Sequence, residues 1–387
     1  MDKETKLQIL KDLVSINTVD ANENEVAEYL ASLFDNYDIG HEVIKQFDNR
    51  SNLVAEIGHD NDKVIAFEGH EDTVHENNRS EWKHDPFNPV VVDNKIYGRG
   101  VTDMKAGLAA MAIALIELKE EKVHLSGRLK FIATISEELT QGGANYLSQE
   151  GLIDDVDAMV VGEPTGNEID GKNHHKLIFG HKGALIYTVK SIGKAAHSST
   201  PELGIDAIEN LIQYRLAEQK YFANQNQVDE DLGKTIYTPD VFEGGKQVNS
   251  IPDFALQKVM VRTIPQLTNE QIIEDLHKLI DQFNQKDGFN LSLEINFSGN
   301  PVKSNLDSKI VEVIQEKATE QFGEPFALDT LSLGTDASQY KTRKPNLDLL
   351  VLGPGNQTAH QTDENIDLDS YFSFIDLYKE IAKKYLE

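Results

Sequence analysis

Short, almost wholly apolar runs separated by helical patterns constrain this chain more than any other feature. Apolar residues at nearly every position are typical of strands covered on both faces of a sheet. These runs span residues 52–57, 64–67, 129–135, 158–161 and 349–352. Segments with apolar residues at helical spacing separate several of them, at 4–15, 24–35, 104–120, 140–149, 307–320 and 367–384. The alternation predicts an α/β protein.

The middle of the chain follows a different pattern. Segments 185–191 and 254–261 look like half-buried strands, and segments 204–219 and 268–283 look like helices. Their order suggests a β-α-β-β-α-β unit of the ferredoxin-like kind. We therefore expect a main domain made of residues 1–177 and 298–387, with an inserted α+β domain at 178–297.

Charge and composition exclude several classes of protein. The 387 residues include 37 Lys and Arg against 65 Asp and Glu, a net charge of −28 that disfavours nucleic acid as a partner. No apolar run approaches the roughly 18 residues that a membrane span needs. The absence of cysteine excludes thiolate metal sites and cysteine nucleophiles. The first residues lead into no apolar signal segment, so we expect a cytoplasmic protein without a membrane partner.

Acids and histidines collect in five loops that follow a predicted strand or open a helix. Without thiolates, a metal such as zinc must be bound by histidine nitrogens and carboxylate oxygens. Taken singly, each loop has an ordinary explanation, such as a helix cap or an exposed turn. Together they supply enough ligands for two metals with a shared carboxylate, and a further acid to act as general base. The residues are His70 with Asp72, then Asp103, then Glu137 with Glu138, then Glu163, and finally His360.

These loops, in this order, resemble the M20 family of metallopeptidases and deacylases, in particular its acetylornithine deacetylase and succinyl-diaminopimelate desuccinylase group. The resemblance extends over essentially the whole chain, including the insert. It implies a mixed-sheet zinc-hydrolase catalytic domain with an inserted ferredoxin-like lid and dimerisation domain. The matching motifs are 69–74, 97–105, 137–138, 162–165, 193–198, 244–252, 261–262 and 359–361.

The family also implies roles for the residues of the main domain. His70, Asp103 and Glu163 resemble the ligands of one zinc, and Asp103, Glu138 and His360 those of a second. Asp103 would bridge the two ions, for which cobalt or manganese are possible substitutes. Glu137 is similar to the family's general base, although Glu138 as base with Glu137 as ligand is the alternative. Asp72 resembles the acid that orients the first histidine ligand.

Further roles fall mainly on the insert. His197 resembles a lid histidine that, in dimeric members, reaches the partner subunit's site and donates to the developing oxyanion. Asn249 and Arg262 resemble residues that hold polar groups of the substrate, and Lys182 occupies a position where related enzymes have a basic residue. Gly334 and Thr335 resemble a loop that lines the substrate pocket. The alternative for the substrate-binding positions is that they are ordinary polar residues of the surface. The alternative for His197 is a surface histidine whose hydrogen bonds are satisfied within the chain.

The resemblance implies a zinc-dependent hydrolase that cleaves the linear amide bond of a small N-acyl amino acid. Within the family the chain is most similar to succinyl-diaminopimelate desuccinylases of lysine and diaminopimelate biosynthesis. The alternatives are an acetylornithine deacetylase of arginine biosynthesis, an M20 dipeptidase or carboxypeptidase, and a catalytically silent binding protein on the same fold. A homodimer formed through the lid domain is also implied.

Overall fold

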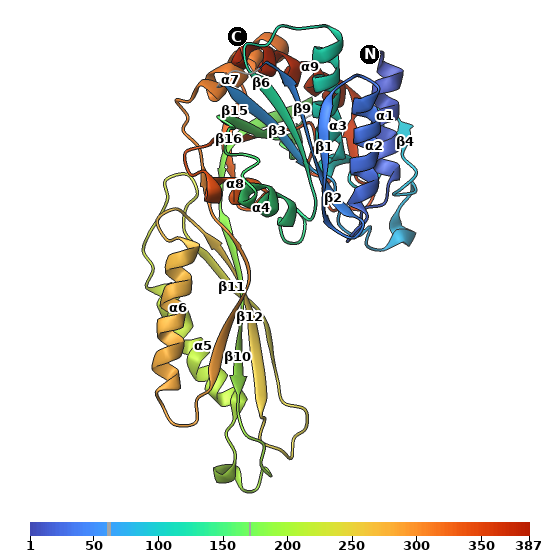
Figure 1. Ribbon diagram of the computed structural model, residues 1–387. Helices are drawn as coiled ribbons and strands as arrows, with labels where there is room; N and C mark the ends of the chain where they lie inside the picture. The colour runs from blue at the N-terminus through green and yellow to red at the C-terminus, as the bar shows by residue number, and fades with distance from the viewer. Residues whose placement is uncertain (60–62, 170–171) are drawn as a thin grey trace. The chain divides into compact units, whose positions relative to one another are not determined.

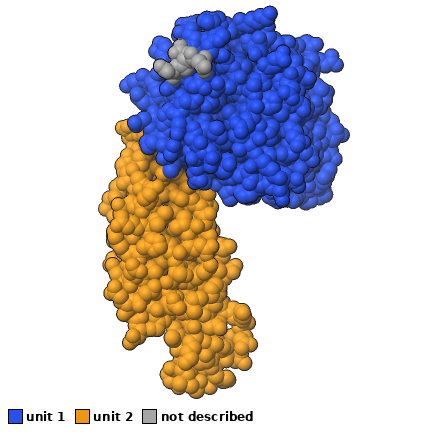
Figure 2. Space-filling view, in the orientation of Figure 1, with its two compact units in different colours: residues 1–180, 304–329, 335–387 blue, residues 181–303, 330–334 orange. Residues whose placement is uncertain are grey.

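The computed structural model describes residues 1–59, 63–169 and 172–387. These divide into two compact units (Figure 2). Unit 1 contains residues 1–180, 304–329 and 335–387, and unit 2 contains residues 181–303 and 330–334. The sequence-based boundaries at 177 and 298 lie a few residues away, and no sequence pattern indicated that residues 330–334 belong with the insert.

A mixed sheet forms the centre of unit 1 (Figure 1). Its strands are β1 (Gly40–Phe47), β2 (Arg50–Gly58), β3 (Val64–His70), β6 (Arg128–Thr134), β7 (Ala158–Val161), β8 (Gly166–Ile169), β9 (Lys172–His181), β15 (Ala327–Leu331) and β16 (Asp348–Val351). The order is β1-β2-β6-β3-β7-β16-β9, with the two-residue strand β14 (Val302–Lys303) after β9, and β8 and β15 also pair with β9. The inner strands β6, β3, β7 and β16 run parallel, whereas β1, β2 and β9 pair antiparallel. The predicted α/β class with a mixed sheet is confirmed.

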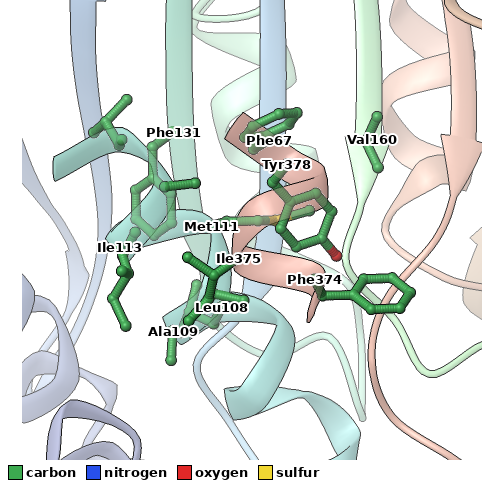
Figure 3. Packing of buried hydrophobic residues seen from close by; sticks show 14 of the residues in the cluster. Phe67, Leu108, Ala109, Met111, Ile113, Phe131, Val160, Phe374, Ile375 and Tyr378 are labelled. Atoms are coloured by element: carbon green, nitrogen blue, oxygen red, sulfur yellow. The ribbon is translucent and has the colours of Figure 1, made fainter. Parts of the chain in front are cut away.

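Helices pack against this sheet, and the most deeply buried of them is α3 (Ala106–Glu120). Every residue of α3 from Ala106 to Leu118 is buried, as expected for a helix that is apolar on all sides. It packs against α9 (Leu368–Tyr385) and the inner strands, so that Met111, Phe67 and Tyr378 meet in one core (Figure 3). The other helices of unit 1 are α1 (Lys3–Ser15), α2 (Glu23–Asp35), α4 (Gly142–Gln149), α7 (Lys309–Phe322) and α8 (Ala337–Arg343).

Short irregular elements join these layers. A small sheet has the order β17-β5-β4, and a five-residue π-type turn, η2 (Val101–Lys105), leads directly into α3. The three strands are β4 (Val90–Val92), β5 (Lys95–Tyr97) and β17 (Asn365–Asp367), and two 3-10 turns are η1 (Arg79–Glu81) and η3 (Pro201–Leu203). The sequence predicted one helix from residue 104, but Asp103 and Met104 have non-helical backbone angles and α3 begins at Ala106.

Unit 2 has the predicted ferredoxin-like architecture. Its elements are β10 (Gly183–Ile192), α5 (Ala207–Ala223), β11 (Ile236–Gly244), β12 (Phe254–Thr263), α6 (Asn269–Asn284) and β13 (Leu291–Gly299), followed by β14 (Val302–Lys303). The sheet order is β11-β12-β10-β13, all antiparallel, and both helices pack against it around a separate apolar core. Among the described residues, no helix is long and apolar enough to cross a membrane.

A buried carboxylate ties helix α5 to the sheet of unit 2. The side chain of Glu218 is fully buried. Its Oε1 accepts hydrogen bonds from the hydroxyls of Tyr187 and Tyr214, at 2.8 and 3.2 Å. Its Oε2 accepts from the Tyr237 hydroxyl at 2.5 Å and from Gln257 Nε2 at 2.8 Å. Four donors therefore stabilise this anion in the interior.

Candidate metal centre

The parallel strands of unit 1 bring acidic loops to one edge of the sheet. His70 is the last residue of β3, Glu137 and Glu138 follow β6, and Glu163 follows β7. Strand β3 pairs in parallel with both β6 and β7, so the carboxyl ends of all three lie together. Open α/β sheets form their binding sites at this edge.

Two groups of possible ligands share His70 at this edge. In one, atoms of His70, Glu137 and Glu163 lie within 4.8 Å of one another, and in the other the same is true of His70, Asp103 and Glu138. His70 Nε2 lies 3.0 Å from Asp103 Oδ1 and 3.6 Å from Glu163 Oε1. The three residues predicted to bind the first metal, His70, Asp103 and Glu163, therefore lie together around one imidazole nitrogen.

His360 extends the cluster on the other side of Asp103. Its Nε2 lies 3.3 Å from Asp103 Oδ2 and 3.0 Å from Glu138 Oε2. Asp103 therefore directs one carboxylate oxygen toward His70 and the other toward His360. That is the arrangement expected of a carboxylate shared by two cations.

Asp72, predicted to orient His70, contacts both this histidine and the turn that carries the two glutamates. Its Oδ1 accepts a hydrogen bond from the Glu137 amide at 3.0 Å, and its Oδ2 accepts from the Glu138 amide at 3.2 Å. The same Oδ1 lies 3.6 Å from His70 Nδ1, which is 2.9 Å from the Asp72 carbonyl oxygen. Asp72 thereby contacts the imidazole chiefly through its carbonyl oxygen and holds the turn that carries the two glutamates through its carboxylate.

Glycines allow the loop that carries Glu163 to approach its neighbours closely. A Cβ atom on Gly107, in the first turn of α3, would lie 2.1 Å from the carbonyl oxygen of Gly162. A Cβ atom on Gly353, after β16, would lie at the same distance from the same oxygen. Because neither side chain would fit, glycine at both positions is a packing requirement of the segment just before Glu163.

Negative charge dominates the cluster. Burial alone would lower the pKa of His70, but Glu163, Asp103 and Asp72 outweigh it and hold this pKa well above its ordinary value. Contacts with Asp103 and Glu138 raise the pKa of His360 to about 10. Burial raises the pKa of Glu137. Burial also raises the pKa of Glu163, and the nearby Asp103 carboxylate raises that pKa further. Such a surplus of buried carboxylates calls for a neutralising cation.

The donor set therefore fits divalent metal ions. It offers two imidazole nitrogens and several carboxylate oxygens within a few ångströms, and the chain has no thiolate to compete. Nitrogen and oxygen ligands of this kind suit zinc, cobalt and manganese. His70, Asp103 and Glu163 would hold one ion, and Asp103, Glu138 and His360 the second.

Candidate residues of unit 2 lie in two neighbouring loops and on the sheet. Ile251 donates a backbone hydrogen bond to Ala196 at 2.8 Å, which brings the loops of His197 and Asn249 together. Both of these side chains are exposed, and His197 Nδ1 lies 2.7 Å from Ser199 Oγ. A cavity of about 520 Å³ lies beside these loops, lined by Ala195, Lys246, Ser250 and Phe254 among others.

The two cationic candidates of unit 2 differ in what their side chains contact. Arg262, on β12, is half-buried and makes no ion pair with any residue that the structure describes. Burial lowers its pKa. Lys182 is buried, and its ammonium donates to the backbone carbonyls of Leu232 and Lys234. Arg262 is therefore the better placed of the two to pair with an added carboxylate.

The loop predicted to line a substrate pocket is split between the units. Gly334 belongs to unit 2 and Thr335 to unit 1. Thr335 is buried, and its Oγ1 accepts a hydrogen bond from the Ala337 amide at 3.3 Å.

Sequence reasoning missed one pair of residues at the centre. Arg99 and Glu364 are both fully buried and form an ion pair of 2.6 Å. Arg99 lies inside the recognised motif at 97–105, but no pattern linked it to an acid so far along the chain. A buried arginine beside ligand-bearing segments is a signal that only the folded structure supplies.

A mixed sheet with acids and imidazoles at the carboxyl ends of its strands defines a class, the metal-dependent hydrolases of the α/β type. The chain belongs to the family described as "Peptidase family M20/M25/M40", whose model matches residues 66–384. It is an amide-bond hydrolase of that family.

The chain is similar to curated relatives in sequence and to solved structures in fold, in each case over nearly its whole length. The chain is 37% identical to a protein of Staphylococcus aureus named "Probable succinyl-diaminopimelate desuccinylase", over 100% of this chain and 98% of the relative. An M20 metallo-carboxypeptidase of Sulfolobus solfataricus has a similar fold, with a TM-score of 0.81, 21% identity and coverage of 100% and 99%. A dinuclear metal-binding M20 peptidase of Bacillus subtilis has a TM-score of 0.70 at 17% identity, with coverage of 99% and 98%.

Proposed function

We propose that this protein is a succinyl-diaminopimelate desuccinylase, which hydrolyses the amide bond of an N-succinylated diamino acid to succinate and the free amine. The observation that carries the proposal is the shared carboxylate of Asp103, flanked by His70 and His360. The substrate comes from the curated relative, which matches the chain from end to end. Lysine and diaminopimelate biosynthesis and a cytoplasmic location belong to the same proposal.

We assign two zinc ions to the site, with cobalt or manganese as working substitutes. Their ligands are the two sets that share Asp103. Such ions, when bound, polarise the carbonyl of the scissile amide and lower the pKa of a water molecule.

Glu137 is assigned as the general base. Its carboxylate makes no side-chain hydrogen bond to a residue that the structure describes, whereas Glu138 pairs with His360. That difference favours Glu137 as the base and Glu138 as the ligand. Glu137 takes a proton from the attacking water and passes it to the leaving amine, so one water is consumed for each amide bond.

The lid residues are assigned to substrate recognition. Arg262 can hold a carboxylate with two parallel hydrogen bonds, which suits a substrate rich in carboxylates. Asn249, Gly334 and Thr335 contribute polar contacts, and Lys182 acts through its charge because its ammonium already donates to two carbonyls. His197 donates to the developing oxyanion in the partner subunit's site.

A homodimer through the lid domain completes the proposal. Strand β11 lies at the edge of the unit 2 sheet, with Ile236 and Phe242 exposed. Helix α5 exposes Ile212 and Leu216 at a spacing of one helical turn. An unpaired edge beside exposed apolar residues is a surface suited to pairing with a second copy.

The test is a substrate panel with the purified protein and added zinc or cobalt. N-succinyl-diaminopimelate, N-acetylornithine and several dipeptides are compared by kcat/KM, with Glu137→Gln as the matched variant. We expect the succinylated substrate to be preferred and Glu137→Gln to lose at least 100-fold in kcat while still binding metal. Preference for N-acetylornithine or a dipeptide would reject the desuccinylase assignment, and no turnover of any amide would favour a binding protein.

A further inference from the structure

The side chain of Glu364 gathers four donors from one segment of the chain. It is fully buried, and its Oε2 accepts from Arg99 Nη1 at 2.6 Å and from the Gly100 amide at 3.0 Å. Its Oε1 accepts from the amides of Thr102 and Asp103, at 2.8 and 3.1 Å. Both carboxylate oxygens are thereby saturated.

These bonds join two parts of the candidate metal centre. The donors run from Arg99 to Asp103, the segment that ends in the shared carboxylate. Glu364 itself follows His360 by four positions in the same loop. One buried side chain therefore links the segment of Asp103 to the loop of His360, although more than 250 residues separate the two in sequence.

The loop of His360 has other contacts as well, among them a backbone hydrogen bond from the Gly98 amide to the Glu364 carbonyl at 3.1 Å and the pairing of β17 with β5 just beyond the loop. The imidazole is about half exposed, and His360 adopts a left-handed backbone angle, φ +63°. Its carbonyl accepts from Asn77 Nδ2 at 3.2 Å, and Asp363 Oδ1 accepts from the Lys83 amide at 2.8 Å. Both of these bonds are exposed, and none of these other contacts reaches the amides of Gly100, Thr102 and Asp103, which the buried side chain of Glu364 binds.

The other cation position is supported differently. His70 is the last residue of β3, and Glu163 follows β7, an adjacent strand of the buried central sheet. Ligands on the ends of packed strands keep their positions when one loop contact is lost. Asp103 is common to both positions, but only the second uses His360, which lies in the loop of Glu364, so the second should lose more affinity than the first when Glu364 is changed.

We propose that Glu364, held by Arg99, is a positioning residue that fixes Asp103 relative to His360 and so controls binding of the second cation. The proposal rests on the two-cation site put forward above. It assigns no contact with substrate to Glu364. Mutation of a residue that orients a metal ligand typically lowers the affinity for the metal by about 10- to 100-fold.

The experiment is a calorimetric titration of metal-free protein with cobalt. We expect two binding events in the wild type. In Glu364→Gln, the neutral amide keeps one acceptor but places an NH₂ group against backbone amides, so one event should weaken at least tenfold and the other less than threefold. Arg99→Met should give the same pattern, and Arg99→Lys, which retains the charge, an intermediate one.

A double variant identifies which position is affected. His360→Ala should bind a single cobalt ion, and adding Glu364→Gln should change that remaining affinity by less than threefold. A tenfold further loss would mean that Glu364 acts on the first position as well and would overturn the proposal.

A matched control separates positioning from general destabilisation. Glu218→Gln alters another fully buried carboxylate with four donors, in unit 2, and should lower the melting temperature while leaving both cobalt affinities unchanged. If Glu364→Gln binds both ions like the wild type, or if Glu218→Gln weakens cobalt equally, the positioning role is wrong. If the wild type itself binds no cobalt, the two-cation function fails and the positioning role fails with it.

Discussion

Replacing Asp72 by asparagine tests whether its carboxylate holds the turn of Glu137 and Glu138 in place. The two oxygens of Asp72 accept from two different amides, those of Glu137 and Glu138. Asparagine retains one acceptor and turns an NH₂ group toward the other amide. One charge-assisted hydrogen bond is lost outright, and such bonds contribute about 1.5–3 kcal/mol each.

That energy converts into a measurable change in metal binding. About 1.4 kcal/mol corresponds to a factor of ten in affinity. Because Glu138 is a proposed ligand of the second cation, Asp72→Asn should bind that cation roughly 10- to 100-fold more weakly than the wild type. We expect kcat to fall by a similar factor because Glu137 moves with the same turn. Competition with a chromophoric chelator measures the affinity, and steady-state kinetics measures kcat.

Asp206→Asn is the matched control. Asp206 also accepts from two backbone amides, those of Ile208 and Glu209 at the start of α5, but a single oxygen, Oδ1, accepts both. Asparagine can therefore replace it with little loss, since it caps helices about as well as aspartate does. If Asp72→Asn binds metal and turns over as well as Asp206→Asn, the supporting role of the two carboxylate oxygens is refuted.

Two further changes test packing and charge in unit 1. Gly107→Ala places a Cβ atom 2.1 Å from a backbone carbonyl and should destabilise the fold by about 3 kcal/mol, whereas Gly40→Ala, with open space around it, should be nearly neutral in urea unfolding. Burial opposes ionisation of Glu117, but Lys6 and Lys379 outweigh it and lower its pKa to about 2. The stability that this carboxylate contributes is therefore present above pH 4.5 and is lost as the pH falls toward 2. Glu117→Gln should be roughly 2 kcal/mol less stable at pH 7, and a deficit that persists unchanged at pH 2 would contradict this account.

Much of the fold followed from apolar patterning. The all-apolar segment after Lys105 predicted a buried helix, and α3 is buried along almost its whole length. The β-α-β-β-α-β order of the elements expected in the insert predicted the ferredoxin-like sheet of unit 2. What patterning missed were short strands, such as β4 and β5, because three residues carry too little periodicity to distinguish a strand from a loop.

The predicted start of α3 was wrong for a physical reason. Asp103 and Met104 have non-helical backbone angles, and the amides of Thr102 and Asp103 donate to Glu364. This acceptor lies more than 250 residues away in the sequence. Local sequence cannot reveal a restraint of that kind.

Candidate ligands were easier to find than their supports. Histidines and acids at strand ends stand out by residue type, and the structure brings His70, Asp103, Glu138, Glu163 and His360 together. Lys182 was predicted to contact the substrate because related enzymes have a basic residue at this position, and in the structure its ammonium donates to two backbone carbonyls. Whether a lysine contacts solvent or backbone depends on the loop that covers it, which the sequence does not specify.

Anomalous diffraction from crystals grown with zinc tests the central claim most directly. We predict two zinc peaks per chain, about 3.5–4 Å apart, with the Asp103 carboxylate between them and His70 and His360 on opposite sides. A single peak, or peaks bound away from Asp103, would contradict the two-cation centre and the hydrolytic chemistry derived from it.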